Sequence, residues 1–532
     1  MICRNTSHDF EERSDEKSWT WARRRLMETK KDGINRAKWW QVAGLAVNDI
    51  GTNTYMWMMI FISYYLNGIV GVGVVVASSL ATAMRLWDGV TDPLIGMILD
   101  KTNGRFGKNR PFLVIGQLIM LIMSAFMFFV TPEFPKAAQF VAFILFYAVY
   151  IIGYTCQCVV TKSAQTCLTS DQKQRSSFGI YYGILNTVFF TVAPLYSYSY
   201  LLGKHNFRFD MSYFTEMWKA GAVLSLICTV ITYLAIREKD RPEFYGTGDS
   251  EENQVKFKDY IDVLKHNKAL QMLVISASSD KLGRQMNGNA TVSIIIYAII
   301  CGNAAAAGLI GAYTTIPGIL ILLFGIGFVA RKFGQMKGFT YSSYGAIVVL
   351  AGLIALFVIG DPTSLSLPGD GNFAGWNAFS ILFVVLMVCF TGFQNIAGGL
   401  VYPMTADCTD YEVYRSGRYV PGLIGTVFSF IDKLISSLAP LIVGFMCTIV
   451  SSSAELPTAE TAYSKGLAAV GIICMFGVVL LGYVCNVVSM KFYPLNKEMM
   501  DSIAEDIAKI KNKSAKTDTT TVGNEELELN EA

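Results

Sequence analysis

Residues 86–111 read LWDGVTDPLIGMILDKTNGRFGKNRP, and two carboxylates in this stretch, Asp88 and Asp92, lie inside an otherwise apolar run. A spacing of four residues places both side chains on one face of a helix. The apolar residues on either side extend far enough to form a membrane span, which needs about 20 residues. A carboxylate at bilayer depth costs roughly 2.5–3.5 kcal/mol on insertion scales. The pair therefore needs a compensating cation or water and is the main candidate site in the chain.

The composition is that of a membrane protein. The chain has 532 residues, of which 52% are hydrophobic and 16% are charged, whereas a soluble chain of this length carries more charge and splits into several cores. The net charge of +3 gives no reason to expect a nucleic-acid partner. The eleven cysteines form no CxxC pair and the three histidines are dispersed, so no structural metal is expected.

Apolar runs bounded by polar loops predict about twelve membrane spans and an all-α polytopic fold. We expect these spans near residues 39–66, 70–99, 112–130, 140–161, 178–202, 217–236, 270–301, 305–330, 339–359, 376–404, 422–450 and 466–490. Basic residues gather in alternate loops, which by the positive-inside bias places both termini in the cytoplasm. The loop with Lys204, Arg208 and Lys219 is an exception on the predicted outer side.

A charged segment divides the spans into two sets. Residues 237–268 are predicted to be a cytoplasmic linker between two six-helix halves, residues 39–236 and 269–491. Residues 1–38 form a predicted cytoplasmic tail, and residues 492–532 a cytoplasmic amphipathic helix followed by a disordered tail.

There is also a short internal echo between the two sets. Arg105-Phe106-Gly107-Lys108 is echoed by Lys332-Phe333-Gly334-Gln335 at the equivalent place in the second half. Membrane proteins built from repeats show such symmetry, although a match this short also arises by chance.

Separated blocks of sequence, in a fixed order, resemble the motifs of one known family. They are Arg85-Leu86-Trp87-Asp88, Thr91-Asp92-Pro93, Gly107-Lys108 with Arg110-Pro111, Ala406-Asp407 to Tyr411, Gly417, Gly422, Phe430-Ile431-Asp432-Lys433 and Tyr493-Pro494-Leu495. The family is the glycoside–pentoside–hexuronide cation symporters of the major facilitator superfamily, the group that includes bacterial melibiose permease. The resemblance covers most of the chain and implies the major facilitator fold.

The resemblance implies a site for a coupling cation. Asp88 and Asp92 match the family's paired carboxylates, and Thr155 matches a threonine whose hydroxyl can complete the cation's shell. Lys433 matches a lysine that replaces the cation's charge when the site is empty. Thr91 stands where melibiose permease has asparagine, so the choice between Na⁺, Li⁺ and H⁺ stays open.

The two carboxylates and Lys433 can also be interpreted as residues without a function. Asp88 and Asp92 would then be a solvated pair at a helix end, but about seven apolar positions follow Asp92, roughly 10 Å of helix. Lys433 would then extend its side chain to the membrane surface, but it lies near the middle of its span. The position of both features favours the cation site. The role of Asp432 beside Lys433 stays open.

The cargo site resembles the family less. Asp49 matches an aspartate that binds sugar hydroxyls, and a buried aspartate without a function is rare at this depth. Its partner aspartate is replaced by Cys158, an arginine by Gly183, and two tryptophans by Lys162 and Gly398. These losses indicate a cargo other than melibiose.

Charged residues in the seventh span offer replacements for the lost cargo anchors. Asp280, Lys281 and Arg284 interrupt this span, either as a simple ion pair four residues apart or as new anchors. The predicted cargo-binding residues are Asn48, Asp49, Tyr154, Gln157, Cys158, Lys162, Arg284 and Ser429.

The resemblance further implies a cytoplasmic gate, in which basic loops pair with carboxylates and helix ends in one conformation. Its predicted residues are Arg105, Lys108, Arg110, Asp407, Asp410, Arg415 and Arg418, with Asp100 as a further partner.

The expected function is symport of a sugar, glycoside or related small organic solute, coupled to Na⁺ or H⁺, by alternating access. The alternative is a proton-coupled transporter or exporter of an amphipathic organic anion or drug, favoured by Lys162 and Arg284. We expect no enzyme activity and no cofactor other than the coupling cation. The protein is expected to work as a monomer that spans the plasma membrane several times, with the solute, the cation and the bilayer as its partners.

Overall fold

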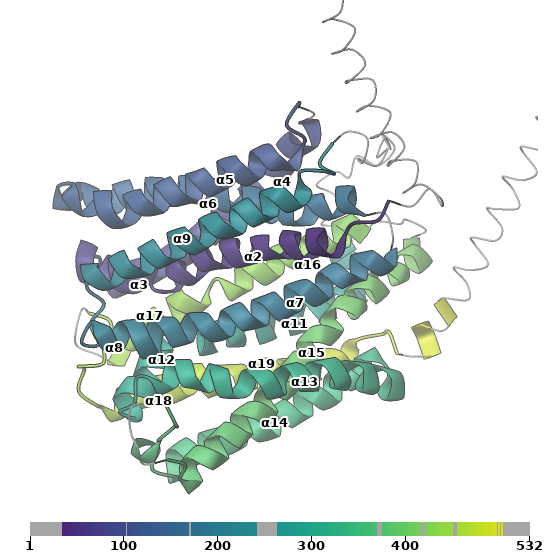
Figure 1. The fold of residues 1–532 in the computed structure, drawn as a ribbon. Coiled ribbons are helices and arrows are strands. Elements are labelled where there is room, and N and C mark those ends of the chain that lie inside the picture. Colours follow the sequence, from purple (N-terminus) through teal and green to yellow (C-terminus); the bar gives the residue numbers. More distant parts are fainter. Residues whose placement is uncertain are drawn as a thin grey trace, which may run out of the picture.

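The structure is a computed structural model and describes residues 35–102, 104–169, 172–241, 263–369, 375–416, 421–450, 455–496, 498–500 and 502–503. Nearly all of these residues are helical, and the described part contains a single isolated β-bridge, between Gly104 and Gly107. Figure 1 shows long helices that lie side by side along a common direction. The predicted all-α fold is confirmed.

The first half of the chain forms a series of long helices joined by short connections. In order they are α2 (Trp39–Ile60), α3 (Ile62–Tyr65), η1 (Leu66–Val70), α4 (Val74–Lys101), α5 (Asn109–Ala125), η2 (Phe126–Val130), η3 (Thr131–Glu133), α6 (Lys136–Leu168), α7 (Gln172–Pro194), η4 (Leu195–Leu201), α8 (Leu202–Lys204) and α9 (Met211–Ile236). The elements η1, η2 and η4 are π-helical turns that continue the preceding helix.

The second half repeats this pattern. Its elements are α11 (Lys268–Asn287), α12 (Ala290–Ser293), η6 (Ile294–Ile300), α13 (Ala306–Phe333), α14 (Gln335–Ile359), η7 (Pro362–Ser364), α15 (Ala378–Ser416), α16 (Pro421–Ser436), α17 (Ala439–Val450), α18 (Lys465–Ile472), η8 (Ile473–Gly477) and α19 (Val478–Phe492).

Seven helices in the described part are long and apolar enough to cross a membrane. They are Asn109–Glu133, Lys136–Gln165, Met211–Ile236, Gln335–Ile359, Ala378–Ser416, Phe430–Val450 and Lys465–Phe492. Helices α2, α4 and α11 have 22, 28 and 20 residues but are not among the seven. Each of these three carries charged side chains of the candidate site in its interior. The count of twelve spans and the position of the termini stay predictions.

The apolar cores follow the two sets of helices. One cluster of buried side chains runs from Val263 to Ile503, while two others are drawn mainly from residues 37–236. Helix α4 packs against α17, and α7 packs against α13, which joins the two sets. The predicted linker lies mostly outside the described residues, as do most of the two predicted tails. The domain boundaries therefore stay predictions.

The internal echo has the same backbone conformation in both places. Gly107 and Gly334 have left-handed φ angles of 85° and 79°, and each stands just before a long helix, α5 and α14 respectively. A side chain is strained at such a φ, so glycine is the favoured residue. A Cβ at Gly107 would also lie 2.3 Å from the backbone oxygen of Asp240. The shared turn supports an origin of the two halves in a repeat.

Loops at the predicted outer end hold the two halves together. The hydroxyl of Tyr64 donates to the carbonyl of Pro457 at 2.8 Å, and the amide of Leu456 donates to Asn67 Oδ1 at 2.8 Å. Arg208 Nε lies 2.9 Å from Glu460 Oε1 in an exposed ion pair. The bundle is therefore closed at this end.

Candidate functional site

Two carboxylates of α4 meet one lysine of α16 near the middle of the bundle. Lys433 Nζ lies 2.6 Å from Asp92 Oδ2 and 3.2 Å from Asp88 Oδ2. The side chain of Asp88 is fully buried, while those of Asp92 and Lys433 are 34% and 28% exposed. The four-residue spacing on α4 brings both carboxylates to the same side, as predicted from the sequence. Their bonds to Lys433 place this lysine in the interior of the bundle rather than at its surface.

Two threonine hydroxyls complete this cluster. Thr155 Oγ1 on α6 donates to Asp88 Oδ1 at 3.2 Å, and it lies 3.1 Å from Thr91 Oγ1. Thr91 Oγ1 in turn donates to the carbonyl of Asp88 at 3.1 Å. The structure thus brings together all five residues predicted for the cation site, and we call them the cation cluster. Two carboxylates and one ammonium give this cluster a formal charge of −1, which leaves it able to attract a further cation.

A second ion pair stands next to the cation cluster. Lys281 on α11 donates to Asp432 Oδ2, and the side chain of Asp432 is only 8% exposed whereas that of Lys281 is 46% exposed. Successive residues on a helix point about 100° apart, so Asp432 faces α11 while Lys433 faces α4. Sequence reasoning left Asp432 without a role. The sequence does contain a signal for this pair. Asp432 is an acidic residue next to a basic one in the middle of a span, and the seventh span contains a lysine.

Arg284 occupies space that a larger residue at position 398 would fill. Its Nε donates to Asp280 Oδ2 at 2.9 Å, and its Nη2 donates to the carbonyl of Gln394 at 2.7 Å. A Cβ built on Gly398 would lie 2.7 Å from Arg284 Nη2. A side chain at position 398 and the guanidinium of Arg284 would therefore compete for the same space. Arg284 forms the predicted ion pair with Asp280 and is partly exposed, while its role as a cargo anchor stays a prediction.

Asp49 belongs to a polar group between α2 and α7. Its Oδ2 accepts a hydrogen bond from Asn53 Nδ2 at 3.3 Å and another from Asn186 Nδ2. All three side chains are partly exposed. Sequence reasoning missed both asparagines, although Asn53 lies four residues after Asp49 on the same helix face. We call these three residues the amide–carboxylate group.

Two predicted cargo residues lie in contacts between helices instead. Asn48 is buried and donates to Thr161 Oγ1 at 2.9 Å, while Gln157 is buried and donates to the carbonyl of Leu113 at 2.7 Å. These bonds join α6 to α2 and to α5. Both side chains are buried and hydrogen-bonded between packed helices, so neither is available to a solute in this structure. We leave both out of the cargo site.

The other predicted cargo residues differ in exposure. Lys162 is exposed on α6, one turn beyond the partly buried Cys158. The hydroxyl of Tyr154 lies 3.9 Å from the sulfur of Met56, a weak contact. The side chain of Ser429 lies outside the described residues.

Two basic residues of the predicted gate form ion pairs within their own halves. Arg110 Nε lies 3.4 Å from Asp240 Oδ2, and Arg415 Nη2 lies 2.7 Å from Glu412 Oε1. Asp240 and Glu412, both buried, were not predicted as partners.

The remaining gate residues differ in exposure. Asp407 and Asp410 are partly buried, Lys108 is partly exposed and Arg105 is exposed, while Arg418 lies outside the described residues, as does the side chain of Asp100. The predicted pairing of the first-half basic loop with Asp407 and Asp410 is not what Arg110 forms in this structure.

A cavity of about 120 Å³ lies between the two halves, lined on one side by apolar and on the other by polar side chains. Met56, Met59 and Tyr147 come from the first half, and Gln285 and Asn289 from the second. Ser436, three residues after Lys433, also lines it, so the cavity borders α16, the helix that contributes Lys433 to the cation cluster.

Comparison with known proteins identifies the family to which this chain belongs. A sequence model described as "MFS/sugar transport protein" matches residues 46–497. The chain belongs to this family. Seven apolar helices and this family assignment make it a multi-pass transport protein of the plasma membrane, as predicted.

Individual relatives are similar to this chain in sequence, and a solved structure is similar to it in fold. A "Glucuronide carrier protein homolog" of Escherichia coli (strain K12) is 23% identical over 497 residues, which cover 88% of this chain and 95% of that protein. "Sodium-dependent lysophosphatidylcholine symporter 1" of Gallus gallus is 25% identical over 209 residues, 34% of this chain and 39% of that protein. A bacterial homologue of the human peptide transporters PepT1 and PepT2 shares the fold with a TM-score of 0.58 and 12% identity, over 88% of this chain and all of that chain.

Proposed function

We propose that this protein is a symporter in which the cation cluster binds one monovalent cation together with a small organic solute. The observation that carries the proposal is Lys433 Nζ between Asp88 and Asp92, at 3.2 and 2.6 Å. The Lys433 ammonium, placed so closely between two carboxylates, supplies the positive charge that a bound cation would otherwise supply. The oxygens of Thr91 and Thr155 supply the hard ligands that Na⁺ or Li⁺ would need.

The exchange of Lys433 for a cation would link the two halves of the bundle. Asp88, Asp92 and Thr155 belong to the first half, whereas Lys433 belongs to the second. Binding of Na⁺ or of a proton weakens the attraction of the carboxylates for Lys433 and so frees α16 to move relative to α4. By linkage, a cation that favours the solute-binding conformation is itself bound more tightly when solute is present.

Alternating access then follows from movement of the two halves about the cavity between them. The structure is closed at the predicted outer end, while Arg110 and Arg415 at the predicted inner end bind within their own halves. These contacts support an inward-facing state. A membrane potential adds roughly 2.3 kcal/mol per charge per 100 mV to inward cation movement.

The proposed cargo is a sugar, a glycoside or a related hydroxyl-rich solute. The amide–carboxylate group of Asp49, Asn53 and Asn186 offers both acceptors and donors to hydroxyl groups. Arg284 offers a guanidinium that is already partly exposed. The glucuronide carrier homolog among the relatives supports this class of cargo.

Transport into proteoliposomes with an imposed Na⁺ or H⁺ gradient tests the coupling. We expect wild-type protein to accumulate its solute against a gradient, and Asp92→Asn to abolish accumulation while expression and solute exchange persist. Fully concentrative uptake by Asp92→Asn would show that the cation assignment is wrong.

A second candidate function is proton-coupled transport of an amphipathic organic anion. It is favoured by the exposed Lys162 and Lys281 and by the cavity with one apolar and one polar wall. The lysophosphatidylcholine symporter among the relatives carries an amphipathic cargo. Counterflow in vesicles with a panel of sugars and of organic anions separates the two candidates, because only the cargo class that exchanges is transported.

We further infer that the protein is a carrier rather than an enzyme and that it works as a monomer. The transport relatives support the first inference. The second rests on the presence of the cation cluster and the amide–carboxylate group within one chain.

A further inference from the structure

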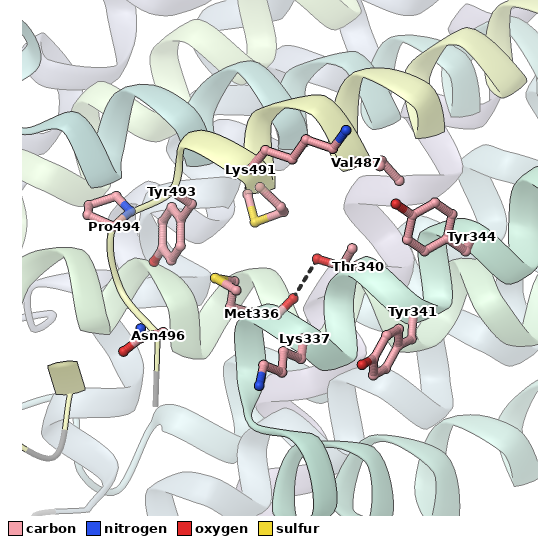
Figure 2. Close-up of a pocket in the computed structure, with 11 residues that line it drawn as sticks. Met336, Lys337, Thr340, Tyr341, Tyr344, Val487, Lys491, Tyr493, Pro494 and Asn496 are labelled. Carbon is pink, nitrogen blue, oxygen red and sulfur yellow. Dashed lines mark hydrogen bonds between the residues drawn. The ribbon is translucent and has the colours of Figure 1, made fainter. Parts of the chain in front are cut away.

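A separate hollow lies between α14 and α19 in the second half and has a volume of about 310 Å³. Figure 2 shows Lys337, Thr340 and Tyr341 on α14 at one side of it and Lys491 on α19 at the other. Asn496, in the segment that follows α19, also lines it. Because α14 begins and α19 ends here, this pocket belongs to the predicted cytoplasmic end of the bundle.

The pocket is positively charged. The side chains of Lys337 and Lys491 are exposed, and neither forms an ion pair within the described residues. The hydroxyl of Thr340 and the phenol of Tyr341 add neutral hydrogen-bonding groups. Glu498 borders an adjoining hollow of about 150 Å³ at the start of α14. Two lysines on facing helices are the kind of site that binds a phosphate group.

Apolar side chains continue from this pocket along the outside of the bundle. Val348 on α14 and Val488 on α19 are exposed, at 71% and 47% of their surface, as is Phe492 at 57%. In a membrane protein such side chains contact lipid tails. Tyr341 and Tyr344 are half exposed between the lysines and this apolar strip, as aromatic residues are at the membrane interface.

In the first half, the equivalent position at the start of α5 is occupied by an aspartate side chain. The carboxylate of Asp240 accepts hydrogen bonds from the backbone amides of Lys108, Asn109 and Arg110 at 3.2, 3.0 and 2.9 Å. These amides follow the left-handed Gly107 and begin α5. A helix N-terminus binds an anion because its first N–H groups have no partner within the helix. In the first half, that anion is an internal side chain.

The second half has the same turn, but the position that corresponds to Asp240 holds Asn496, and the nearby carboxylate is that of the exposed Glu498. Asp240 stands four positions after Ile236, the end of α9, and Asn496 stands four positions after Phe492, the end of α19. Helix α9 packs against α5, and α19 packs against α14. Asn496 is neutral, and its Oδ1 accepts from the amide of Met499 at 2.8 Å. The start of α14 has no side-chain cap.

We propose that this pocket binds the headgroup of an anionic phospholipid. Its phosphate takes the position that the Asp240 carboxylate has in the first half, at the first N–H groups of α14. Lys337 and Lys491, which lie on opposite sides of the pocket in Figure 2, turn toward the phosphate when it binds. Its acyl chains lie along the strip of Val348 and Val488. The site is independent of the transport mechanism proposed above, since it contains no residue of the cation cluster or of the amide–carboxylate group.

Native mass spectrometry of the full-length protein in detergent tests the site. The probes are phosphatidylglycerol and phosphatidylcholine with identical acyl chains, and inorganic phosphate at millimolar concentration. We expect one phosphatidylglycerol to bind in clear preference to phosphatidylcholine, and binding to weaken roughly fivefold for each lysine removed in Lys337→Gln and Lys491→Gln. The matched control is Lys136→Gln with Lys465→Gln, which removes two exposed lysines at the predicted outer end and leaves binding unchanged.

Asn496→Asp provides a second test that does not depend on the lysines. The new carboxylate recreates the arrangement of the first half and should exclude the lipid phosphate, while Asn496→Gln should not. Equal binding of the two lipids, unchanged binding after removal of both lysines, or unchanged binding in Asn496→Asp would overturn the proposal. Complete displacement of the lipid by inorganic phosphate would also overturn it, because the site would then be one for a free anion.

Discussion

The cation cluster and the region proposed for cargo lie in the same bundle but differ in how closely their charged groups are bonded to one another. In the cation cluster, Lys433 bonds directly to both Asp88 and Asp92. In the cargo region, Arg284 fills the space above Gly398. A small hard ion needs oxygen ligands at fixed distances, whereas a cargo site can be rebuilt around a different solute. On the proposed function, we expect the cation cluster to determine coupling and the cargo region to determine specificity.

The largest expected effect is on the cation cluster. Asp88→Asn removes a fully buried charge that contacts both Lys433 and Thr155. We expect the accumulation ratio in proteoliposomes to fall to unity, from up to about fiftyfold per charge at 100 mV. Asp361→Asn, at an exposed helix cap on the predicted outer side, is the control and should accumulate solute normally. If Asp88→Asn still accumulated solute, the proposed distinction between a coupling region and a cargo region would be wrong.

A tryptophan introduced at the cargo region should be harmful. Gly398→Trp places its side chain against the guanidinium of Arg284, and overpacking of this kind costs about 1–3 kcal/mol. We expect a lower melting temperature for the purified protein. Arg284→Ala alone should also destabilise the protein, because it leaves the buried Asp280 without its partner. The double variant should nevertheless lose less than the sum of the two single losses, because Arg284→Ala vacates the space that the tryptophan needs. Additive losses in the double variant would show that the two side chains do not compete for the same space.

Loss of Asn186 should affect cargo and leave the cation alone. Asn186→Ala removes a donor to Asp49, and a hydrogen bond to a charged group contributes about 1.5–3 kcal/mol. We therefore expect the KM for solute to rise roughly tenfold or more, with the cation affinity unchanged. Thr187→Ala, next to it on α7 and bonded only to its own helix, should leave both constants unchanged. A shift of the cation affinity in Asn186→Ala would mean that the two regions are not separate.

The smallest effect on transport is expected at Gln157. Gln157→Ala removes the bond to the carbonyl of Leu113, which costs about 1–3 kcal/mol of stability because a buried acceptor loses its partner. The KM for solute should not change if this residue only joins α6 to α5. A higher KM at unchanged melting temperature would return Gln157 to the cargo site.

The sequence carried enough information for the fold and for the cation cluster. Long apolar runs and alternating basic loops predict an all-α membrane bundle, and the four-residue spacing of Asp88 and Asp92 fixes their common face. Lys433 was identified by resemblance and by its depth in the span. Its contact with both carboxylates required the structure, since 341 positions separate it from Asp92 along the chain.

The cargo region and the gate were harder to predict. Asn48 and Gln157 are polar residues in apolar spans, and periodicity does not reveal whether such a residue faces a cavity or a neighbouring helix. Likewise, the partner of Arg110 proved to be Asp240, whose place at the start of α5 depends on the turn at Gly107. Three-dimensional packing decides such pairings, and no local pattern encodes it.

Calorimetric titration of the purified full-length protein with Na⁺ and Li⁺, together with proton release at several pH values, tests the central claim most directly. The account predicts one saturable cation site in the wild type, and its loss in Asp88→Asn and Asp92→Asn. Absence of binding of Na⁺, Li⁺ or H⁺ by the wild type, or binding that persists unchanged in both variants, would contradict it.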